Sequence, residues 1–358
     1  MRILLISPAS SIHTIRWTNA LINHVDELCL ASIHEPLEKL DTRIKFIKLK
    51  YPAPLGYFLN YKKLRNIIKE FKPDLINTHY LSGYGTLSAL AISKIKTPYL
   101  LSMWGSDIYD FPEKSIFHKR LIKWVCKKAS KLASTSIAMK TEFNSKYPDI
   151  NLPIVITPFG VDTDLFSPIE NRREEDAFEI GIAKVLKEKY GIEYLIKAFN
   201  IFQKEKKYSN SRLHIIGDGE LEKELKALAF NNPKIKFHGR IQNSNLPEYL
   251  NKWDVYVIPS IIESFGVSAV EASSCALPVI VSNVGGLPEV IVDKVTGIVV
   301  EKCDPYAIAE GLKILYNDKQ LRLSMGQQGR KRVLEHYSWN DNVLTMLEVY
   351  NEMISKTE

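Results

Sequence analysis

The stretch Val255-Tyr-Val-Ile-Pro-Ser260, followed by Glu263-Ser-Phe-Gly-Val-Ser-Ala-Val-Glu271 and then by Cys275-Ala-Leu-Pro-Val-Ile280, decides the fold of this chain. The first and last segments are short apolar runs of the kind that form buried strands. Between them lie a short loop and a segment with helical character. Strand, loop, helix and strand in this order predict a parallel α/β sheet. Ligands of such sheets bind beside the carboxyl ends of the strands, and Glu263 falls in the loop at that end.

The helix of this stretch should begin near Phe265, Gly266 and Val267. Its first amides and the positive end of its dipole attract phosphate, and glycine lets a ligand approach the backbone closely. We therefore expect donor contacts from the segment that runs from Ser264 to Val267. Glu271, about one and a half turns further on, can accept hydrogen bonds from sugar hydroxyls but repels phosphate. Such a pocket suits a nucleotide-sugar. The alternative is an ordinary amphipathic helix that carries two glutamates by chance.

The stretch closely resembles the Glu-x7-Glu motif of the family 4 (group 1) retaining glycosyltransferases. Further segments occur in the order and spacing of that family: Pro259-Ser260, Glu263-Ser-Phe-Gly266, Pro278-Val-Ile280, Gly285-Gly-Leu-Pro-Glu-Val290 and Thr296-Gly297. The resemblance implies the GT-B fold, in which two Rossmann-like, doubly wound parallel-sheet domains face each other across a cleft. It also implies a retaining hexosyltransferase that moves a sugar from a nucleotide-sugar to a glycan or lipid-linked acceptor, in the synthesis of a cell-surface polysaccharide or glycolipid.

The rest of the chain alternates apolar runs with amphipathic segments, which is typical of parallel sheets covered on both faces. Residues 61–71 and 117–129 form the clearest helices of the first half, and residues 168–176 are polar and aperiodic. We predict an acceptor-binding domain over 1–165, a linker over 166–177, a nucleotide-sugar-binding domain over 178–336 and a final helix over 337–358 that crosses back. Strands are expected at 3–7, 27–32, 44–49, 74–78, 99–103, 131–135, 154–157, 178–182, 212–216, 235–238, 255–259, 278–282 and 297–300, and helices of the second half at 191–205, 220–230, 247–251, 265–275 and 305–316.

Two cations and two glycine turns follow strands of the second domain. Lys184 and Lys189 come directly after the strand 178–182 and suit a diphosphate leaving group. In the family, arginine and lysine hold these places; here lysine replaces the arginine and binds phosphate without a bidentate fork. Gly217 lies in a turn that resembles the family's Gly-x-Gly, and Gly239 and Arg240 end the next strand. We expect donor contacts from all of them, the alternatives being exposed loop lysines and ordinary turn chemistry.

The acceptor side is assigned to loops of the first domain. Trp104-Gly-Ser-Asp107 resembles the family's His-Gly-x-Asp motif, in which the histidine lies near the transferred sugar. Tryptophan cannot act as an acid or base, but its ring can stack on a sugar. Asp107 can bind an acceptor hydroxyl or, alternatively, cap its own loop. His13 and His79 follow two other strands and are expected to contact the acceptor, unless they serve as structural donors.

No protein group stands out as a general base or a metal ligand. In the family, retention is thought to need no protein nucleophile, because the departing phosphate assists the incoming hydroxyl. Stabilisation of the diphosphate by lysines and helix amides is then the main task. Asp162-Thr-Asp164 has the spacing of a metal site, but the family carries a similar segment without that role. We predict a metal-independent enzyme without a cofactor, in which the nucleotide-sugar is a co-substrate.

Composition and charge suggest a cytoplasmic protein that touches a membrane surface. The four cysteines are scattered, which fits a reducing compartment, and no apolar run approaches the roughly 20 residues of a spanning helix. Residues 1–165 carry 23 Lys and Arg against 14 Asp and Glu. Lysines recur every four residues on one expected helix face, which predicts peripheral docking on an anionic membrane unless the face is merely solvated. These lysines are Lys119, Lys123, Lys127 and Lys131.

Three other classes of protein were considered. A sugar-nucleotide epimerase of the same architecture would need additional acid and base groups, and the Glu-x7-Glu stretch argues against it. A dinucleotide-dependent dehydrogenase is disfavoured because the first strand is not followed by Gly-x-Gly-x-x-Gly. A basic nucleic-acid-binding module would account for the net charge of +7, but it leaves the pocket of carboxylates and amides unexplained.

Overall fold

The computed structural model describes residues 1–92, 95–169 and 177–356 of the 358-residue chain. The chain forms two compact units, one comprising Met1–Pro158 with Asn340–Glu358 and the other Phe159–Trp339. We call them unit 1 and unit 2. The sequence predicted a first domain over 1–165, a linker over 166–177, a second domain over 178–336 and a last helix over 337–358. Residues 170–176 of the expected linker lie outside the described residues.

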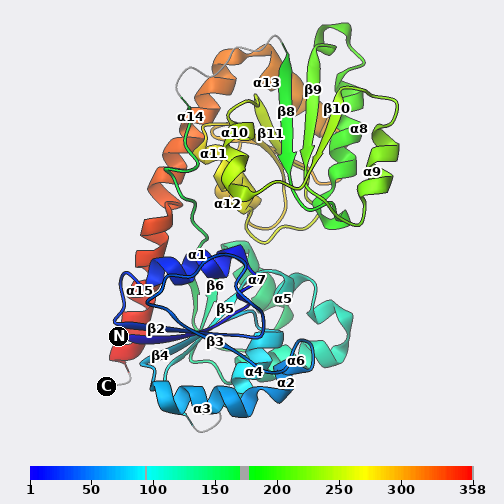
Figure 1. The fold of residues 1–358 in the computed structure, drawn as a ribbon. Coiled ribbons are helices and arrows are strands. Elements are labelled where there is room, and N and C mark those ends of the chain that lie inside the picture. The colour runs from blue at the N-terminus through cyan, green and yellow to red at the C-terminus, as the bar shows by residue number, and fades with distance from the viewer. Residues whose placement is uncertain (93–94, 170–176, 357–358) are drawn as a thin grey trace. The chain divides into compact units, whose positions relative to one another are not determined.

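Unit 1 is built on a parallel sheet of seven strands within the described residues, in the order β3-β2-β1-β4-β5-β6-β7 (Figure 1). The chain starts in the middle of the sheet, builds one half outward from β1, and then returns to build the other half from β4. The strands are β1 (Arg2–Ile6), β2 (Glu27–Ser32), β3 (Lys45–Lys48), β4 (Leu75–His79), β5 (Tyr99–Met103), β6 (Lys131–Ser134) and β7 (Ile154–Ile156).

Helices cover both faces of this sheet (Figure 1). One face shares a hydrophobic core with α3, α4, α6 and α7, whereas α1 and α15 bury apolar residues against the other face. The central strands β1, β4 and β5 are buried along nearly their whole length and form continuous apolar runs, whereas the edge strands β3 and β7 are only partly buried. The helices are α1 (Ile12–Leu21), α2 (Gly56–Leu59), α3 (Tyr61–Phe71), α4 (Gly83–Ala91), α5 (Ser106–Tyr109), α6 (Ile116–Cys126), α7 (Ile137–Lys146) and α15 (Trp339–Ser355).

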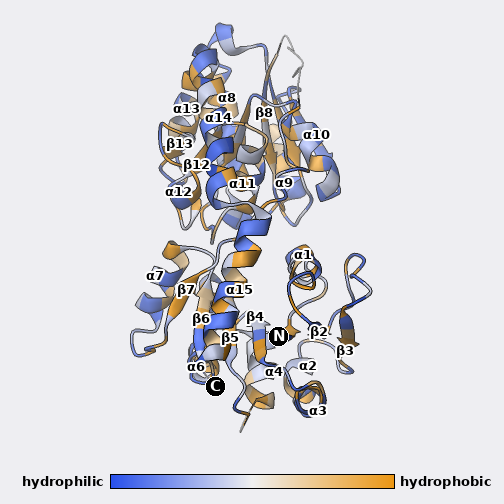
Figure 2. Ribbon diagram, turned by 90° about the vertical axis from the view of Figure 1, so that its left-hand side faces the viewer, coloured by the Kyte–Doolittle hydropathy of each residue, from blue (hydrophilic) through white to orange (hydrophobic). Residues whose placement is uncertain are grey.

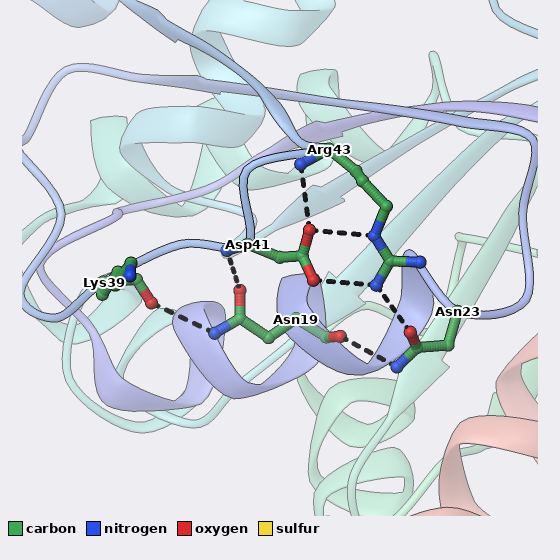
Figure 3. A network of polar contacts seen from close by, with 5 residues as sticks. All are labelled: Asn19, Asn23, Lys39, Asp41 and Arg43. Atoms are coloured by element: carbon green, nitrogen blue, oxygen red, sulfur yellow. Dashed lines mark hydrogen bonds and ion pairs between the residues drawn. The ribbon is translucent and has the colours of Figure 1, made fainter.

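A polar network fastens the loop between β2 and β3 to α1 (Figure 3). Arg43 makes a two-point contact with Asp41, through Nε at 2.9 Å and Nη2 at 2.8 Å, and also donates to Asn23 Oδ1. Asn19 accepts from the Asp41 amide and donates to the Lys39 carbonyl. Because Asn19 and Asn23 belong to α1 and its end, the network steadies the helix that follows β1.

Unit 2 repeats the same plan with a parallel sheet of six strands in the described residues, ordered β10-β9-β8-β11-β12-β13. Its strands are mostly hydrophobic, while its outer helices carry both polar and apolar residues (Figure 2). Helices α8, α9 and α13 share a core with one face, and α11 packs against α14. The elements are β8 (Phe178–Ala183), α8 (Ile192–Phe202), β9 (Ser211–Ile216), α9 (Glu222–Ala229), β10 (Ile235–Gly239), α10 (Leu246–Leu250), β11 (Val255–Ile258), α11 (Val267–Ser274), β12 (Val279–Ser282), α12 (Leu287–Val290), β13 (Gly297–Val300), α13 (Pro305–Asn317) and α14 (Lys319–His336).

The predicted fold class is confirmed: both units are Rossmann-like parallel sheets with helices on both faces. Each expected strand exists, and no end differs by more than one residue from the expected one. One helix boundary matters for function. Helix α6 ends at Cys126 rather than at residue 129, Lys127 caps it, and Lys131 begins β6. The expected stripe of four lysines on one helix therefore does not form.

Candidate functional site

The loops that follow four neighbouring strands of unit 2 meet at one edge of the sheet. β8 lies between β9 and β11, and the chain leaves β8 toward β9 before it returns to β11 on the other side. Such a reversal of strand order is called the switch point, and open α/β sheets bind their ligands in the crevice beside it. Lys184 directly follows β8, Gly217 follows β9, and Glu263 lies in the loop after β11.

Lys184 and Glu263 form an ion pair at this point. Lys184 Nζ lies 2.6 Å from Glu263 Oε2, and only 13% and 11% of the two side chains are exposed. Burial alone would lower the pKa of Lys184, but the Glu263 carboxylate and the phenol oxygens of Tyr190 and Tyr256 raise it above its ordinary value. The lysine is therefore a permanent cation, which can neutralise an anionic ligand at the switch point.

Tyr256 holds the end of β8, the strand that Lys184 directly follows. The register between β8 and β11 pairs Val255 with Ile180 and Tyr256 with Gly181, and goes no further along β8. The buried Tyr256 hydroxyl then accepts from the Ala183 amide at 2.9 Å and donates to the Ala183 carbonyl at 3.0 Å. It takes the place of the missing strand contacts and holds the residue just before Lys184.

Two glycines allow the backbones of the ion pair to be packed closely. A Cβ at Gly217, where φ is +135°, would lie 1.9 Å from the Lys184 carbonyl oxygen. A Cβ at Gly285, where φ is +50°, would lie 1.6 Å from the carbonyl oxygen of Glu263. Neither position can hold a larger residue without moving one partner of the pair. The Gly217 turn and the Gly285-Gly286 turn thus support the two halves of the site.

Helix α11 begins beside Glu263. Gly266 caps it with φ at +100°, and the helix runs from Val267 to Ser274 rather than from residue 265. The Phe265 ring is buried against Phe159 and Tyr337, so only the backbone of this residue remains for the donor contact expected of the segment. The backbone amides at the start of α11 keep the character expected of an anion site.

A cavity of about 450 Å³ lies within unit 2 beside the switch point. Inside it, Glu271 is 5% exposed, and Asn243 Nδ2 donates to its Oε1 at 3.0 Å. A cation and a positioned carboxylate in the lining of one cavity suit a ligand that carries both phosphate and hydroxyl groups. The lining residues are Ala183, Lys184, Val185, Ile216, Gly217, Asp218, Arg240, Ile241, Asn243, Leu246 and Glu271.

Four residues expected from the sequence, namely Lys184, Gly217, Arg240 and Glu271, thus line one cavity. Lys189 does not line it. It lies in a short 3₁₀ turn. The backbone carbonyl of Lys189 accepts hydrogen bonds from the amides of Ile261 and Ile262, which directly precede Glu263 in the sequence.

Sequence reasoning missed Asn243 and Tyr256. Asn243 follows Gly239-Arg240 in a polar segment after β10, and this position after a strand could have suggested a role in binding. The second was visible as a polar-tipped ring inside an aliphatic strand.

Unit 1 has its own reversal of strand order between β1 and β4. His79, the last residue of β4, is 2% exposed, and its Nδ1 shares a hydrogen bond of 2.8 Å with Ser7 Oγ. Ser7 Oγ also lies 2.7 Å from Thr14 Oγ1. The His79 ring stacks on Trp104, with centroids 4.1 Å apart. The His79 side chain is therefore buried and supports the Trp104 ring, and its expected contact with an acceptor stays a prediction.

Asp107 has the position of the alternative considered for it, a cap of its own loop. It is fully buried, and its Oδ1 accepts the amides of Trp104 and Gly105 while its Oδ2 accepts the amide of Leu81 at 2.9 Å. Burial raises the pKa of this carboxyl although the backbone amides oppose the rise. Since both oxygens are occupied by backbone donors, Asp107 ties two loops together and has no oxygen turned toward an acceptor.

The expected basic stripe is corrected as well. The Lys131 ammonium is buried in β6 and pairs with Glu352 of α15 at 2.7 Å, and Lys123 pairs with Asp149. Two of the four lysines therefore serve the packing of unit 1. No helix of the described ranges is long and apolar enough to cross a membrane. Within the same ranges, no group of three or more His, Cys, Asp or Glu side chains is arranged to hold a metal ion.

Comparison with known proteins agrees with this geometry. Residues 165–332 match the family model of group 1 glycosyl transferases, and residues 2–136 match that of glycosyl transferase 4-like domains. The chain is 32% identical over 361 residues to the capsular polysaccharide biosynthesis glycosyltransferase CapM of Staphylococcus aureus, covering 94% of this chain and 92% of the relative. It is 30% identical over 308 residues to an uncharacterized glycosyltransferase of Methanocaldococcus jannaschii, covering 85% and 83%.

Solved structures share the fold over nearly the whole chain. Sucrose-phosphate synthase from Thermosynechococcus elongatus aligns with a TM-score of 0.85 at 18% identity, covering 99% of this chain and 100% of that one. Anabaena HepE, solved in complex with UDP and glucose, aligns with a TM-score of 0.82 at 18% identity, covering 98% and 99%. The sheet order, the Glu263–Glu271 stretch and the relatives lead to one assignment: the chain belongs to the group 1 glycosyltransferases.

Proposed function

We propose that this enzyme transfers a hexose, with retention of configuration, from a nucleotide-sugar to a hydroxyl of a glycan or lipid-linked acceptor. The observation that carries the proposal is the cavity of unit 2, which joins a permanent cation at Lys184 to a positioned carboxylate at Glu271. We favour uridine diphosphate as the leaving group because HepE is named in complexes with UDP and with UDP-glucose. Because CapM is named for capsular polysaccharide biosynthesis, we place the reaction in cell-surface polysaccharide or glycolipid synthesis.

The donor is held by three kinds of contact. Glu271, oriented by the Asn243 amide, accepts hydrogen bonds from the ribose hydroxyls. The first amides of α11, with Ser264, Gly266 and Val267 at its start, receive the diphosphate. Arg240, which lines the cavity, and Gly239 just before it are assigned to the base.

Lys184 is paired with Glu263 before the donor arrives. The diphosphate competes for this lysine, which frees the Glu263 carboxylate to bind hydroxyls of the sugar that is transferred. Lys189 lies five residues after Lys184, and its carbonyl accepts hydrogen bonds from the loop before Glu263. It adds a second cation for the leaving group.

Transfer then needs neither a protein nucleophile nor a metal ion. The bond between the anomeric carbon and the phosphate oxygen breaks as the acceptor oxygen bonds to the same carbon on the same face. The acceptor proton passes to the departing phosphate, so atoms and charges balance. Lysine charges and helix amides stabilise the negative charge that develops on the diphosphate. In many phosphate-transferring sites a divalent cation does this, and here we assign the task to Lys184 and Lys189.

The acceptor is assigned to unit 1, and the enzyme to the cytoplasmic face of a membrane. All four cysteines are free thiols, which fits a reducing compartment. Helix α6 exposes Ile116 and Phe117 at 57% and 73%, and Lys119 and Arg120 follow them. With Lys127 at the end of the helix, these residues can bind an anionic surface by shallow apolar burial and charge attraction. Phe117→Ser together with Arg120→Gln should reduce sedimentation with phosphatidylglycerol vesicles; unchanged sedimentation would exclude this surface.

The donor assignment is tested by calorimetric titration with UDP, GDP and ADP, followed by incubation with the sugar nucleotide of the base that binds. We expect one nucleotide to bind and its sugar nucleotide to be slowly hydrolysed or transferred with the anomeric configuration kept. Conversion of the free sugar nucleotide into an epimer would instead support the epimerase. Salt-sensitive binding to any DNA duplex, without nucleotide binding, would support a nucleic-acid-binding module.

A further inference from the structure

Three polar side chains of unit 2 are hydrogen-bonded in a row across the adjacent strands β8, β9 and β10 (Figure 1). Glu179 Oε2 lies 2.6 Å from His214 Nε2, and His214 Nδ1 lies 2.9 Å from His238 Nε2. Glu179 belongs to β8, His214 to β9 and His238 to β10. We call these three residues the histidine chain. None of the contacts proposed for the donor involves it.

The buried end of the histidine chain fixes where its hydrogens lie. Only 3% of the Glu179 side chain is exposed, and Arg212 Nη1 donates to its second oxygen at 2.7 Å. Burial alone would raise the pKa of Glu179, but the hydrogen bonds and charges of His214 and Arg212 lower it. Because an ionised carboxylate can only accept, His214 carries its hydrogen on Nε2. The neutral His214 ring then accepts at Nδ1 from His238 Nε2.

His238 lies at a β-bulge of the edge strand. In the described residues, β10 is the outermost strand of its sheet and pairs only with β9. Phe237 and Gly239 pair with consecutive residues of β9, so His238 is the extra residue between them. Bulges are rare in parallel pairs, and they occur beside functional sites, where they re-aim a side chain. The bond from His238 to His214 therefore links the two strands at the point where their regular pairing is interrupted.

His238 connects the histidine chain to the lining of the cavity of unit 2. Gly239 and Arg240 directly follow it, and Arg240 lines the cavity. The Gly239 carbonyl accepts from the amide of Gly217, another lining residue, at 2.8 Å. The His238 ring also lies 5.6 Å from the Tyr249 ring of α10, a helix that begins in the cavity lining. A displacement of His238 would therefore move Arg240 and loosen the contact between Gly239 and Gly217.

We propose that the histidine chain positions the Gly239–Arg240 turn for the nucleotide, and that acid releases the turn and lowers nucleotide affinity. The inference rests on the proposed function, because it takes the cavity of unit 2 as the nucleotide site, and it deepens that function by naming a regulation of the same site. A first proton can bind at the exposed His238 Nδ1 without breaking either bond. A second proton on His214 Nδ1 removes the acceptor, so both nitrogens of the 2.9 Å contact carry hydrogens and the bond breaks.

The charges around the histidine chain give the direction of the pH dependence. Burial, His214 and Lys236 lower the pKa of His238 from its ordinary value of 6.5. Both imidazoles are therefore neutral and joined at pH 7.5, and the bond is lost only as the pH falls below 6.5. Nucleotide affinity should be at its full value above this pH and should decrease below it. The other charged or titratable groups next to the chain are Arg212 on β9, Tyr249 on α10 and Asp254 before β11.

The first test is calorimetry at pH 7.5 and pH 5.0 with UDP, or with GDP or ADP if the wild type binds that nucleotide instead. His238→Ala removes the link and should weaken binding about fivefold at pH 7.5. His238→Gln can still donate to His214 but does not titrate, so it should stay within about twofold of wild type at pH 7.5. Between the two pH values, wild type should lose about fivefold more affinity than His238→Gln, since protonation of the nucleotide affects both proteins equally. His24→Gln, which removes an exposed histidine of unit 1, is the matched control and should behave as wild type does.

The second test, amide hydrogen exchange, needs no nucleotide. The Gly217 amide is protected as long as the Gly239 carbonyl accepts from it. His238→Ala should lower the protection factor of this amide about tenfold at pH 7.5, and a change to pH 5.0 should lower it in wild type but not in His238→Gln. The Leu213 amide, which donates to the Lys234 carbonyl on the other side of the bulge, is the internal control and should keep its protection.

The two tests separate this inference from the function on which it rests. If wild type binds none of the three nucleotides while Gly217 protection depends on His238, the histidine chain is retained and the proposed donor is contradicted. If affinity and Gly217 protection are both unchanged in His238→Ala, the inference is overturned and the donor site remains. Equal acid losses in wild type and His238→Gln would also overturn it. A misfolded His238→Ala would lose protection at Leu213 as well, and the comparison of wild type with His238→Gln then decides.

Discussion

His79 should make unit 1 sensitive to mild acid. Its imidazole is 2% exposed, its Nδ1 shares a hydrogen bond with Ser7 Oγ, and its ring lies against Trp104. Burial lowers the pKa of His79 from 6.5 to about 3. Between these two values the unfolded chain binds a proton that the folded protein does not. The free energy of unfolding should therefore be at its full value above pH 6.5 and should fall as the pH drops below it.

The magnitude follows from the two pKa values. One unit of pKa corresponds to about 1.4 kcal/mol, so lowering the pH from 7.5 to 5 should cost unit 1 about 2 kcal/mol through His79. The limit, reached only below pH 3, is about 5 kcal/mol. For a domain of about 150–250 residues, a loss of about 2 kcal/mol lowers the melting temperature by about 4–8 °C.

The assay compares wild type with His79→Asn in urea at pH 7.5 and at pH 5.0. Asparagine can keep a hydrogen bond to Ser7 and has no charge to gain. The variant is expected to be less stable at both pH values because it fills less space, but wild type should lose about 2 kcal/mol more than the variant between them. Contributions of His34 and Asp107, whose pKa values are also shifted, cancel in the comparison. Equal losses in the two proteins, or an NMR titration of the His79 ring near pH 6.5, would refute the reasoning.

Three further predictions concern the donor site. Glu271→Ala should weaken UDP binding by about 1.5–3 kcal/mol in calorimetry, while Glu263→Ala should mainly lower kcat; wild-type behaviour of both would remove these residues from the site. Turnover should persist in excess EDTA because lysines neutralise the diphosphate, and a loss that magnesium or manganese restores would contradict metal independence. Tyr256→Phe should lower kcat more than it raises KM, since the phenol holds the strand end before Lys184. In the Lys184→Met variant, Tyr256→Phe should lower kcat little further. Losses of kcat that add up in the double variant would show that Tyr256 does not act through Lys184.

Local patterns were sufficient for the architecture. Continuous apolar runs such as Val255–Ile258 form strands because parallel sheets are buried on both faces, and each run was visible without knowledge of its neighbours. The same holds for Glu263, Gly266 and Glu271, whose spacing along a loop and helix places them at a strand end. Chain order then implies that Lys184 and Gly217, which also follow strands, lie at the same edge.

Roles that depend on partners distant in sequence were not accessible in this way. Lys131 looked like the end of a basic helix face until α6 ended one turn early and Glu352, 221 residues away, paired with it. Asp107 looked like a ligand for hydroxyls, and only the fold brings the Leu81 amide to its second oxygen. His79 lies at a strand end as expected. Whether its side chain is buried or open to a ligand depends on how Ser7 and Trp104 pack around it.

The sequence by itself determined the two parallel sheets, the order of their elements and the family to which the chain belongs. These features depend on local signals, namely hydrophobic periodicity, turn glycines and a motif of fixed spacing. Tertiary structure alone decided which charges are free and which are paired, how the Tyr256 hydroxyl holds the end of β8, and that three aromatic rings lie against Trp104 in unit 1. The physical reason is that burial, hydrogen bonding and ion pairing are properties of neighbours in space. Their energies change by several kcal/mol over distances of a few ångströms, which spacing along the chain does not specify.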